Sequence, residues 1–403
     1  MAMRRRAVVV ITTAACLLFT SCDWAQYRYG PSHTGHNPAE TVITPDNVSQ
    51  LQAAWSGPQL GIPHDPLVAE GSVFIASDDD IRPSTLSALD PHDGSVRWSL
   101  TYPNSIGGWG PPAYAGGLLY VSVWTGVDGT LNAYRASDGT LVWSSPSPAP
   151  SGAPAVVGHV VYHGFGVLDR TGFSHGWQAR DSASGEVLFG ARASGIGLPS
   201  VAVADGILYA GAGAYDATGV VNCSGGPPKT CTPLWSYTIA GSTPAVSDGL
   251  VYVTTDSGEL AVFPAMGCGQ PTCAPIWKAT VGTLAVSPAA VARGVVLVNA
   301  QEGSLYAFRA TGCGTPTCSP LWIGVMQGFS GPPSVANGIV FAAANDGKLH
   351  AFSAGGCIGG VCQPLWTGSL TGGEPLTTPV VANGSVLVGT TDRRLHAYRL
   401  PAP

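Results

Sequence analysis

The chain has 403 residues, of which 45% are hydrophobic and only 10% are charged, with 54 glycines and 33 prolines. An apolar content this high excludes an intrinsically disordered polar chain. The formal net charge of −6 offers no basic surface for a phosphate backbone, so we expect no nucleic-acid partner.

The first residues have the pattern of an export signal. Three arginines at 4–6 precede an apolar run over 7–19. As a helix this run would be about 20 Å long, too short for a hydrocarbon core of ~30 Å. Residues 19–22 (FTSC) resemble a bacterial lipobox, whose cysteine becomes the lipidated first residue. We therefore predict a lipoprotein-type signal peptide over 1–21, lipidation of Cys22, and an extracytoplasmic protein held at the cell membrane by its lipid alone. Ordinary signal cleavage, giving a secreted protein, is the alternative.

Residues 22–46 are expected to be a lead and spacer, whereas an internal repeat organises residues 47–403. An aromatic residue recurs at intervals of 42 to 46 residues: Trp55, Trp98, Trp143, Phe189, Trp235, Trp277, Trp322 and Trp366. A proline recurs at intervals in the same range: Pro66, Pro112, Pro154, Pro199, Pro244, Pro288, Pro333 and Pro379. Two independent markers with one period indicate a repeat architecture.

Residues 332–366 illustrate the repeated unit. Residues 334–336 and 339–343 are predicted strands joined by the two-residue turn Asn337-Gly338. A third strand is expected over 348–352 and a fourth around Leu365 and Trp366. Four short antiparallel strands in about 44 residues are typical of a propeller blade.

The two ends of the chain complete one blade. The last unit, from Pro379 to Leu400, has three strands and no tryptophan, whereas residues 47–55 form an unmatched strand at the front. Pairing that strand with the last blade closes the ring and removes its exposed edges. We therefore predict an all-β fold, a single eight-bladed β-propeller of four-stranded antiparallel blades over residues 47–403.

Loops that join second to third strands, and outer to inner strands, share one face of such a ring, here called the loop face. Three aspartates at 78–80 follow a predicted strand there, near His64 and Asp65. Asp78 and Asp80 are weak candidates for Ca²⁺ ligands, because the alternating ligands around a glycine are missing; a solvated turn is the alternative. We expect no metal.

Aromatic and charged residues also gather on the loop face of the first three blades. We predict that this region binds an envelope protein or polymer through Trp109, Trp124, Asp128, Phe165, Asp169, Arg170 and His175. For Trp109 and Trp124, packing between blades is the alternative. Residues 164–176 depart furthest from the repeat, as expected where function is added to a scaffold.

No nucleophile motif is present, so we assign no catalytic residue. We also expect a monomeric protein. His350 and His396 occupy the same position in two repeats and are interpreted as structural.

Eight cysteines form four local pairs, and an even count at repeated spacings in an exported chain predicts disulfides. A zinc site would require two such pairs to converge. The predicted pairs are Cys223 with Cys231, Cys268 with Cys273, Cys313 with Cys318, and Cys357 with Cys362. Each closes a short loop and would stabilise the fold by about 2 kcal/mol.

The repeat pattern, G-x-L-x-A-(Phe/Tyr) followed by a glycine and a tryptophan, occurs at 129–134, 303–308 and 347–352. It resembles the pyrroloquinoline-quinone (PQQ)-type repeat of tryptophan-docking propellers over essentially the whole mature chain. This family includes quinoprotein dehydrogenases, which hold PQQ and Ca²⁺ over the central channel beside an aspartate base. It also includes non-catalytic lipoproteins resembling BamB, the B subunit of the outer-membrane barrel-assembly complex.

Two departures favour the second class. The dehydrogenases carry an adjacent Cys-Cys pair and long insertions, whereas this chain has no Cys-Cys and short loops. We therefore expect a non-enzymatic binding or scaffold protein of the bacterial cell envelope, without a cofactor. A compact PQQ-dependent dehydrogenase, with PQQ and Ca²⁺, is the alternative.

Overall fold

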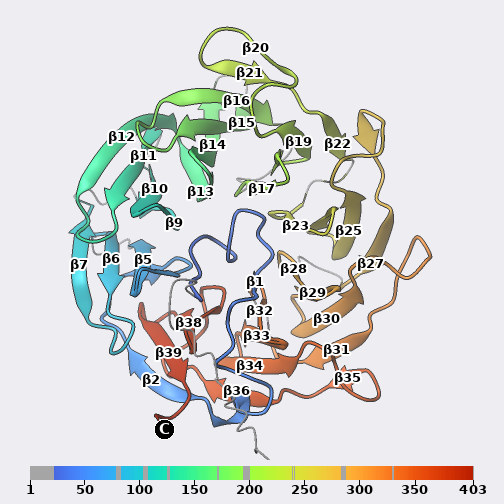
Figure 1. The fold of residues 1–403 in the computed structure, drawn as a ribbon. Coiled ribbons are helices and arrows are strands. Elements are labelled where there is room, and N and C mark those ends of the chain that lie inside the picture. The colour runs from blue at the N-terminus through green and yellow to red at the C-terminus, as the bar shows by residue number, and fades with distance from the viewer. Residues whose placement is uncertain are drawn as a thin grey trace, which may run out of the picture.

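The structure, a computed structural model, describes residues 22–402 apart from 79–82, 103–107, 125–127, 170–171, 194–199, 238, 240, 283–286 and 329–330. For residues 151, 167–169, 172–174 and 193 it describes the backbone alone. The strands form eight sheets that stand around a common axis as a closed ring (Figure 1). The predicted eight-bladed β-propeller is confirmed.

Each blade runs from an inner strand near the axis to an outer strand at the rim. Blade 1 contains β3 (Ile62–Pro63), β4 (Leu67–Ala69), β5 (Ser72–Asp78), β6 (Thr85–Leu89) and β7 (Val96–Thr101), and blade 2 contains β8 (Gly108–Trp109), β9 (Ala113–Ala115), β10 (Leu118–Trp124), β11 (Asp128–Arg135) and β12 (Leu141–Pro148). Blade 3 contains β13 (Pro150–Val157), β14 (Val160–Asp169), β15 (Gly172–Asp181) and β16 (Val187–Ala193), and blade 4 contains β17 (Ala202–Ala204), β18 (Ile207–Ala210), β19 (Gly213–Asp216) and β22 (Trp235–Tyr237). Blade 5 contains β23 (Ala245–Ser247), β24 (Leu250–Thr254), β25 (Glu259–Pro264) and β27 (Trp277–Thr280), and blade 6 contains β28 (Ala290–Ala292), β29 (Val295–Asn299), β30 (Ser304–Arg309) and β31 (Trp322–Val325). Blade 7 contains β32 (Ser334–Ala336), β33 (Ile339–Ala344), β34 (Lys348–Ser353) and β36 (Trp366–Ser369), and blade 8 contains β37 (Val380–Ala382), β38 (Ser385–Gly389), β39 (Leu395–Arg399) and β2 (Gln52–Ser56).

The hydrophobic core lies between neighbouring blades. Phe74 of blade 1 and Leu119 of blade 2 share one buried cluster, and Tyr252 of blade 5 and Phe308 of blade 6 share another. A small twisted sheet has two apolar faces, so each blade can bury both only by stacking on its neighbours.

The recurring tryptophan fixes each blade to the next. Trp98 Nε1 donates to the carbonyl oxygen of Ala136 in blade 2 at 3.0 Å. Gly139, with φ +74°, lies against the indole, and a Cβ at this position would be 2.9 Å from Trp98 Cε3. The glycine and the tryptophan of the repeat therefore form one contact between neighbouring blades.

The ring closes as predicted, with the N-terminal strand β2 antiparallel to β39, and Trp55 opposite Ala397. The strand starts later than expected, because Val48–Gln50 form a 3₁₀ turn, η1. A turn of this period places Val48 and Leu51 on one side, where both are buried. In the described ranges, no helix is long and apolar enough to cross a membrane.

All four predicted disulfides form, and they do more than close local loops. Each disulfide-bonded loop, here called a clip, reaches back to the outer strand of the preceding blade and pairs with it in parallel. The clip strands are β20 (Cys223–Ser224) with β21 (Lys229–Cys231), β26 (Thr272–Cys273) and β35 (Val361–Cys362), and the fourth clip makes a single bridge between Thr317 and Lys278. The clips therefore hold neighbouring blades together.

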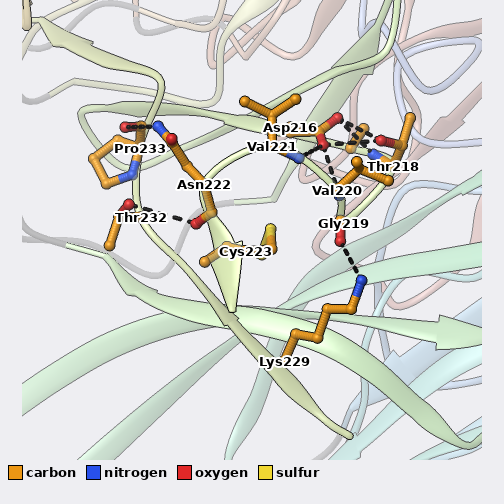
Figure 2. The surroundings of a disulfide bond; sticks show 12 residues. Asp216, Thr218, Gly219, Val220, Val221, Asn222, Cys223, Lys229, Thr232 and Pro233 are labelled. Atoms are coloured by element: carbon orange, nitrogen blue, oxygen red, sulfur yellow. Dashed lines mark hydrogen bonds between the residues drawn. A yellow bond between two sulfur atoms is a disulfide. The ribbon is translucent and has the colours of Figure 1, made fainter. Parts of the chain in front are cut away.

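Figure 2 shows the clip of blade 4. The Asp216 carboxylate accepts hydrogen bonds from the amides of Thr218, Val220 and Val221 at 2.6 to 3.0 Å. Burial acts to raise the pKa of Asp216, but these hydrogen bonds hold it below its usual value. Lys229 Nζ donates to the carbonyl oxygen of Gly219 at 2.9 Å. The clip is thus ordered by its own polar groups as well as by its disulfide.

Candidate functional site

Residues 24–37, here called the axial segment, lie inside the ring, where the blue trace of Figure 1 crosses the centre. Six main-chain amides at equivalent positions of the inner strands donate to its carbonyl oxygens at 2.7 to 3.0 Å. These pairs are Val68 with Trp24, Tyr114 with Ala25, Val203 with Pro31, Val246 with Ser32, Val291 with Thr34, and Val335 with Gly35.

Side chains of the axial segment reach the two remaining blades. Gln26 pairs with the backbone of Val156 in blade 3, and Asn37 Nδ2 donates to the carbonyl oxygen of Val381 in blade 8 at 2.9 Å. One more strand, β1 (His36–Asn37), pairs in parallel with β32. The region treated above as a lead and spacer therefore bonds the inner edge of every blade, which would otherwise be unpaired.

A charged group is buried at the axis. Arg28 is 1% exposed, and its Nη2 donates to the carbonyl oxygen of Ala289 at 2.5 Å, while Nε donates to that of His33 at 3.3 Å. Burial lowers the pKa of Arg28. Burial and, secondly, the charge of Arg28 lower the pKa of His33 to about 3, so His33 is neutral at physiological pH.

Asp65 is the acidic group facing this region. Its carboxylate accepts hydrogen bonds from Thr378, from the amide at 2.6 Å and from Oγ1 at 3.0 Å. Burial raises its pKa even though these bonds and Arg28 act in the opposite direction. The axis therefore holds one guanidinium, one neutral imidazole and one carboxyl group, each with contacts inside the ring.

These residues can accommodate an acceptor better than a cation. Arg28 Nη1 is buried and has no hydrogen-bond partner among the described residues. In the same part of the chain, no three His, Cys, Asp or Glu side chains converge on a point that could hold a metal ion.

Asp78, a weak candidate for Ca²⁺ ligation, is engaged by protein groups. His64 Nε2 lies 2.8 Å from Oδ2, and the amide of Trp109 donates to Oδ1 at 3.0 Å. The second candidate, Asp80, lies outside the described residues. Asp78 thus links the first two blades on the loop face.

His396 and His350 make the same contacts in two blades. His396 Nε2 lies 3.2 Å from Asp392 and Nδ1 lies 2.8 Å from Ser56 Oγ. His350 repeats the pattern, with Asp346 at 3.1 Å and Thr367 Oγ1 at 3.4 Å. A serine, histidine and aspartate in contact would suggest acyl transfer, but recurrence at one repeat position supports the structural interpretation.

The predicted binding residues of blades 1 to 3 differ in exposure. Trp109 is 4% exposed and packs edge-on against Tyr102, and Phe165 and His175 are also buried, whereas Trp124 is 44% exposed and Asp128 is exposed. Residues 164–169 and 172–176 form the distal part of the long β14–β15 pairing, which continues to Asp169 opposite Gly172. The side chain of Asp169 and all of Arg170 lie outside the described residues. Trp124 and Asp128 are therefore the described members of this set that can meet a partner.

Cys22, the predicted lipidation site, is 0% exposed, and its Sγ lies 3.0 Å from the carbonyl oxygen of Ala39. Asn37 Nδ2 donates to the carbonyl oxygen of Cys22 at 2.9 Å. The axial segment thus begins two residues after a residue that is itself packed against the ring.

The positions of Arg28, His33 and Asn37 at the axis were not predicted from the sequence. The density of polar residues in DWAQYRYGPSHTGHNP, at positions 23–38, was the available signal, since a flexible spacer has no need of buried arginine, histidine and asparagine. The pairing of clips with preceding blades had no signal in the spacing of the cysteines.

The chain is similar to one protein family and to several solved structures. Residues 82–241 and 227–315 match the family model described as outer membrane protein assembly factor BamB. No curated protein sequence matches the chain. Among solved structures, a quinohemoprotein alcohol dehydrogenase from Pseudomonas putida HK5 is 16% identical, with a TM-score of 0.68 over 94% of this chain and 82% of that one. The enzyme of the same name from Comamonas testosteroni is 15% identical, with a TM-score of 0.67 over the same shares. The computationally designed protein Ika8 is 16% identical, with a TM-score of 0.64 over 86% of this chain and 99% of that one. At such identities these likenesses concern the fold.

Proposed function

The chain belongs to the BamB family of PQQ-like repeat propellers, and from this premise we propose that it is a non-enzymatic binding scaffold of the bacterial cell envelope. The observation that carries the proposal is a ring bonded to itself along the inner edge of every blade and along the outer edge of four blades. The axial segment contacts all eight inner strands, and four clips cover outer strands. Such a ring offers a rigid surface for a partner.

The ionisable groups of the loop face support the same proposal. Asp78 contacts His64, Asp392 contacts His396, and Asp65 contacts Thr378. A dehydrogenase of this family would require carboxylates free to bind Ca²⁺ and to accept a proton from substrate. Here these three carboxylates hold loops together.

One observation favours the alternative of a PQQ-dependent dehydrogenase. The buried Nη1 of Arg28 would suit a carboxylate of the quinone, and the fold extends over most of two quinohemoprotein dehydrogenases. An assay of dye-linked oxidation distinguishes the two functions. The full chain, purified from cells and supplied with PQQ and Ca²⁺, is expected to oxidise neither alcohols nor sugars. Saturable PQQ binding with dye reduction would establish the dehydrogenase.

We propose further that the protein is exported and held at the membrane by a lipid on Cys22. The disulfides agree with an oxidising, extracytoplasmic compartment. Because the sulfur of Cys22 is disulfide-bonded and buried against Ala39, a lipid on it requires that bond to be absent and residue 22 to turn outward from the ring. Membrane fractionation is the test. Wild-type protein should sediment with membranes and Cys22→Ala should not, whereas equal amounts of both in the soluble fraction would contradict the anchor.

A further inference from the structure

The outer strands of the ring fall into two groups. Those of blades 3 to 6 (β16, β22, β27 and β31) each pair with a clip, whereas the sheets of blades 7, 8, 1 and 2 end at β36, β2, β7 and β12 in the described chain. Half of the rim thus carries unpaired strand edges, which are a template for an added strand.

The clips follow one register rule. The recurring aromatic residue of each repeat is here called the docking aromatic. The residue after it pairs with the residue before the second cysteine of the clip: Gly190 with Thr230, Ser236 with Thr272, Lys278 with Thr317, and Ile323 with Val361. The amides of Ser236, Lys278 and Ile323 donate outward to clip carbonyl oxygens at 2.8 to 2.9 Å. The outward amide at this position is therefore the main-chain group that receives an added strand.

Burial of the docking tryptophans follows the same division. Trp235, Trp277 and Trp322 are 3 to 4% exposed, and the second clip cysteines share their buried clusters. Trp98, at the equivalent position beside an open edge, is half-buried, and the following residue, Ser99, is exposed. An open edge thus presents both the hydrogen-bonding groups and the aromatic surface that a clip covers elsewhere.

Among the open edges, β7 of blade 1 has the fewest obstacles. By the register rule, Ser99 and Thr101 direct their amides outward, and neither is proline; a β-bulge at Arg97 interrupts the alternation on the N-terminal side of Trp98. In β12 the outward position after Ser144 is Pro146, which lacks the donor. In β2 the outward position after Ser56 is Pro58, which also lacks the donor, and in β36 the carbonyl oxygen of Ser369 accepts from Tyr398 Oη.

We propose that the outer edge of β7 binds an extended segment of another protein, parallel to β7. By analogy with the clips, this segment places a hydroxyl-bearing residue opposite Ser99 and a small apolar side chain on Trp98. Three of four clips carry threonine at the first position, and all bury a cysteine at the second. The clip strands carry one charge, on Lys229, so an essentially uncharged segment fits.

A different protein fits this edge better than a second copy of the chain. Two copies of β7 related by a twofold axis would pair antiparallel, whereas every clip runs parallel to the strand that it covers. The inference deepens the proposed binding function and rests on it. Because it is tested without quinone, its failure would leave the absence of dye-linked oxidation unaffected.

The test uses a peptide with the sequence of residues 311–320, TGCGTPTCSP, oxidised to its disulfide and labelled with a fluorophore. Its fluorescence anisotropy is followed as the full-length protein is added. We expect saturable binding to the wild type and to Ser99→Ala, which keeps the amide. Ser99→Pro should bind about fivefold more weakly, the effect of losing one backbone hydrogen bond.

Thermal unfolding shows whether Ser99→Pro is folded, and Thr101→Pro replaces it if it is not. No binding to the wild type, or equal binding to the proline variant, would overturn the proposal. Concentration-dependent dimers in sedimentation equilibrium that the proline variant abolishes would also overturn it, in favour of a second copy on this edge.

Discussion

Gln26 of the axial segment and Val156 of blade 3 are joined by two hydrogen bonds of opposite direction. Gln26 Nε2 donates to the carbonyl oxygen of Val156 at 3.0 Å, and its Oε1 accepts from the amide of Val156 at 2.9 Å. At this blade a side-chain amide takes the place that the main chain of the axial segment has at six others. The pair binds the N-terminal segment to a strand 130 residues away in sequence.

Replacing Gln26 should therefore weaken the whole fold. Gln26→Ala leaves the buried amide and carbonyl of Val156 without partners, and we expect a loss of about 2–4 kcal/mol in the free energy of unfolding. Urea denaturation measures it. Gln52→Ala, at an exposed position of β2, is the matched control and should change stability by less than about 0.5 kcal/mol. Equal effects would mean that the Gln26 pair contributes nothing.

Two glycines of one clip allow the cost of backbone strain to be measured separately from the cost of disturbing the contact between a glycine and Trp277. Gly312 and Gly314 have φ values of +84° and +85°, so alanine at either costs about 1 kcal/mol of strain. A Cβ on Gly312 would also lie 2.7 Å from Trp277 Cδ1, whereas Gly314 faces open space. Gly312→Ala should lose a further ~1–3 kcal/mol, read from urea midpoints. Identical midpoints would show that Trp277 can move away freely.

The clip disulfides should protect the docking tryptophans. In Cys313→Ser combined with Cys318→Ser, the loop over Trp277 loses its closure, and we expect about 2 kcal/mol less stability. Trp277 should also become more exposed, shifting tryptophan emission to longer wavelength. Unchanged emission together with unchanged stability would contradict the role of the clip in covering Trp277.

Two buried histidines should make the fold sensitive to mild acid. Burial, assisted by the nearby charges of Arg28 and Arg180, lowers the pKa of both His33 and His163 to about 3. Between pH 6.5 and 3 the unfolded chain therefore binds protons that the folded chain does not. Stability should fall as pH falls, by at most about 1.4 kcal/mol per pH unit for each histidine.

Urea midpoints at pH 7 and 5 check this dependence, because aspartates with lowered pKa values, such as Asp392, act below that window. His163→Gln should flatten the dependence, whereas His159→Gln, at an exposed position, should leave it unchanged. A slope that is the same in both variants would remove His163 from the explanation.

Much of the architecture was readable from the sequence, because tryptophan, glycine and the Asn-Gly turn each serve one repeated contact. Residues 334–336 were predicted as a strand and are β32. The positions of Arg28 and Asn37 were not predictable, since the axial segment has no repeat of its own and its partners lie in eight separate blades. Periodicity likewise could not show that Trp109 is buried while Trp124 is exposed, because both lie at strand ends.

Hydrogen exchange of the full-length protein tests the central claim most directly, namely that the ring is closed on its own axial segment. Seven inner-strand amides donate to that segment: those of Val68, Tyr114, Val156, Val203, Val246, Val291 and Val335. We expect these amides to exchange together and as slowly as the central strands of the blades, because release of the segment requires global unfolding. Fast exchange of all seven beside slowly exchanging central strands would show a segment that leaves the axis, and would contradict a scaffold closed on itself.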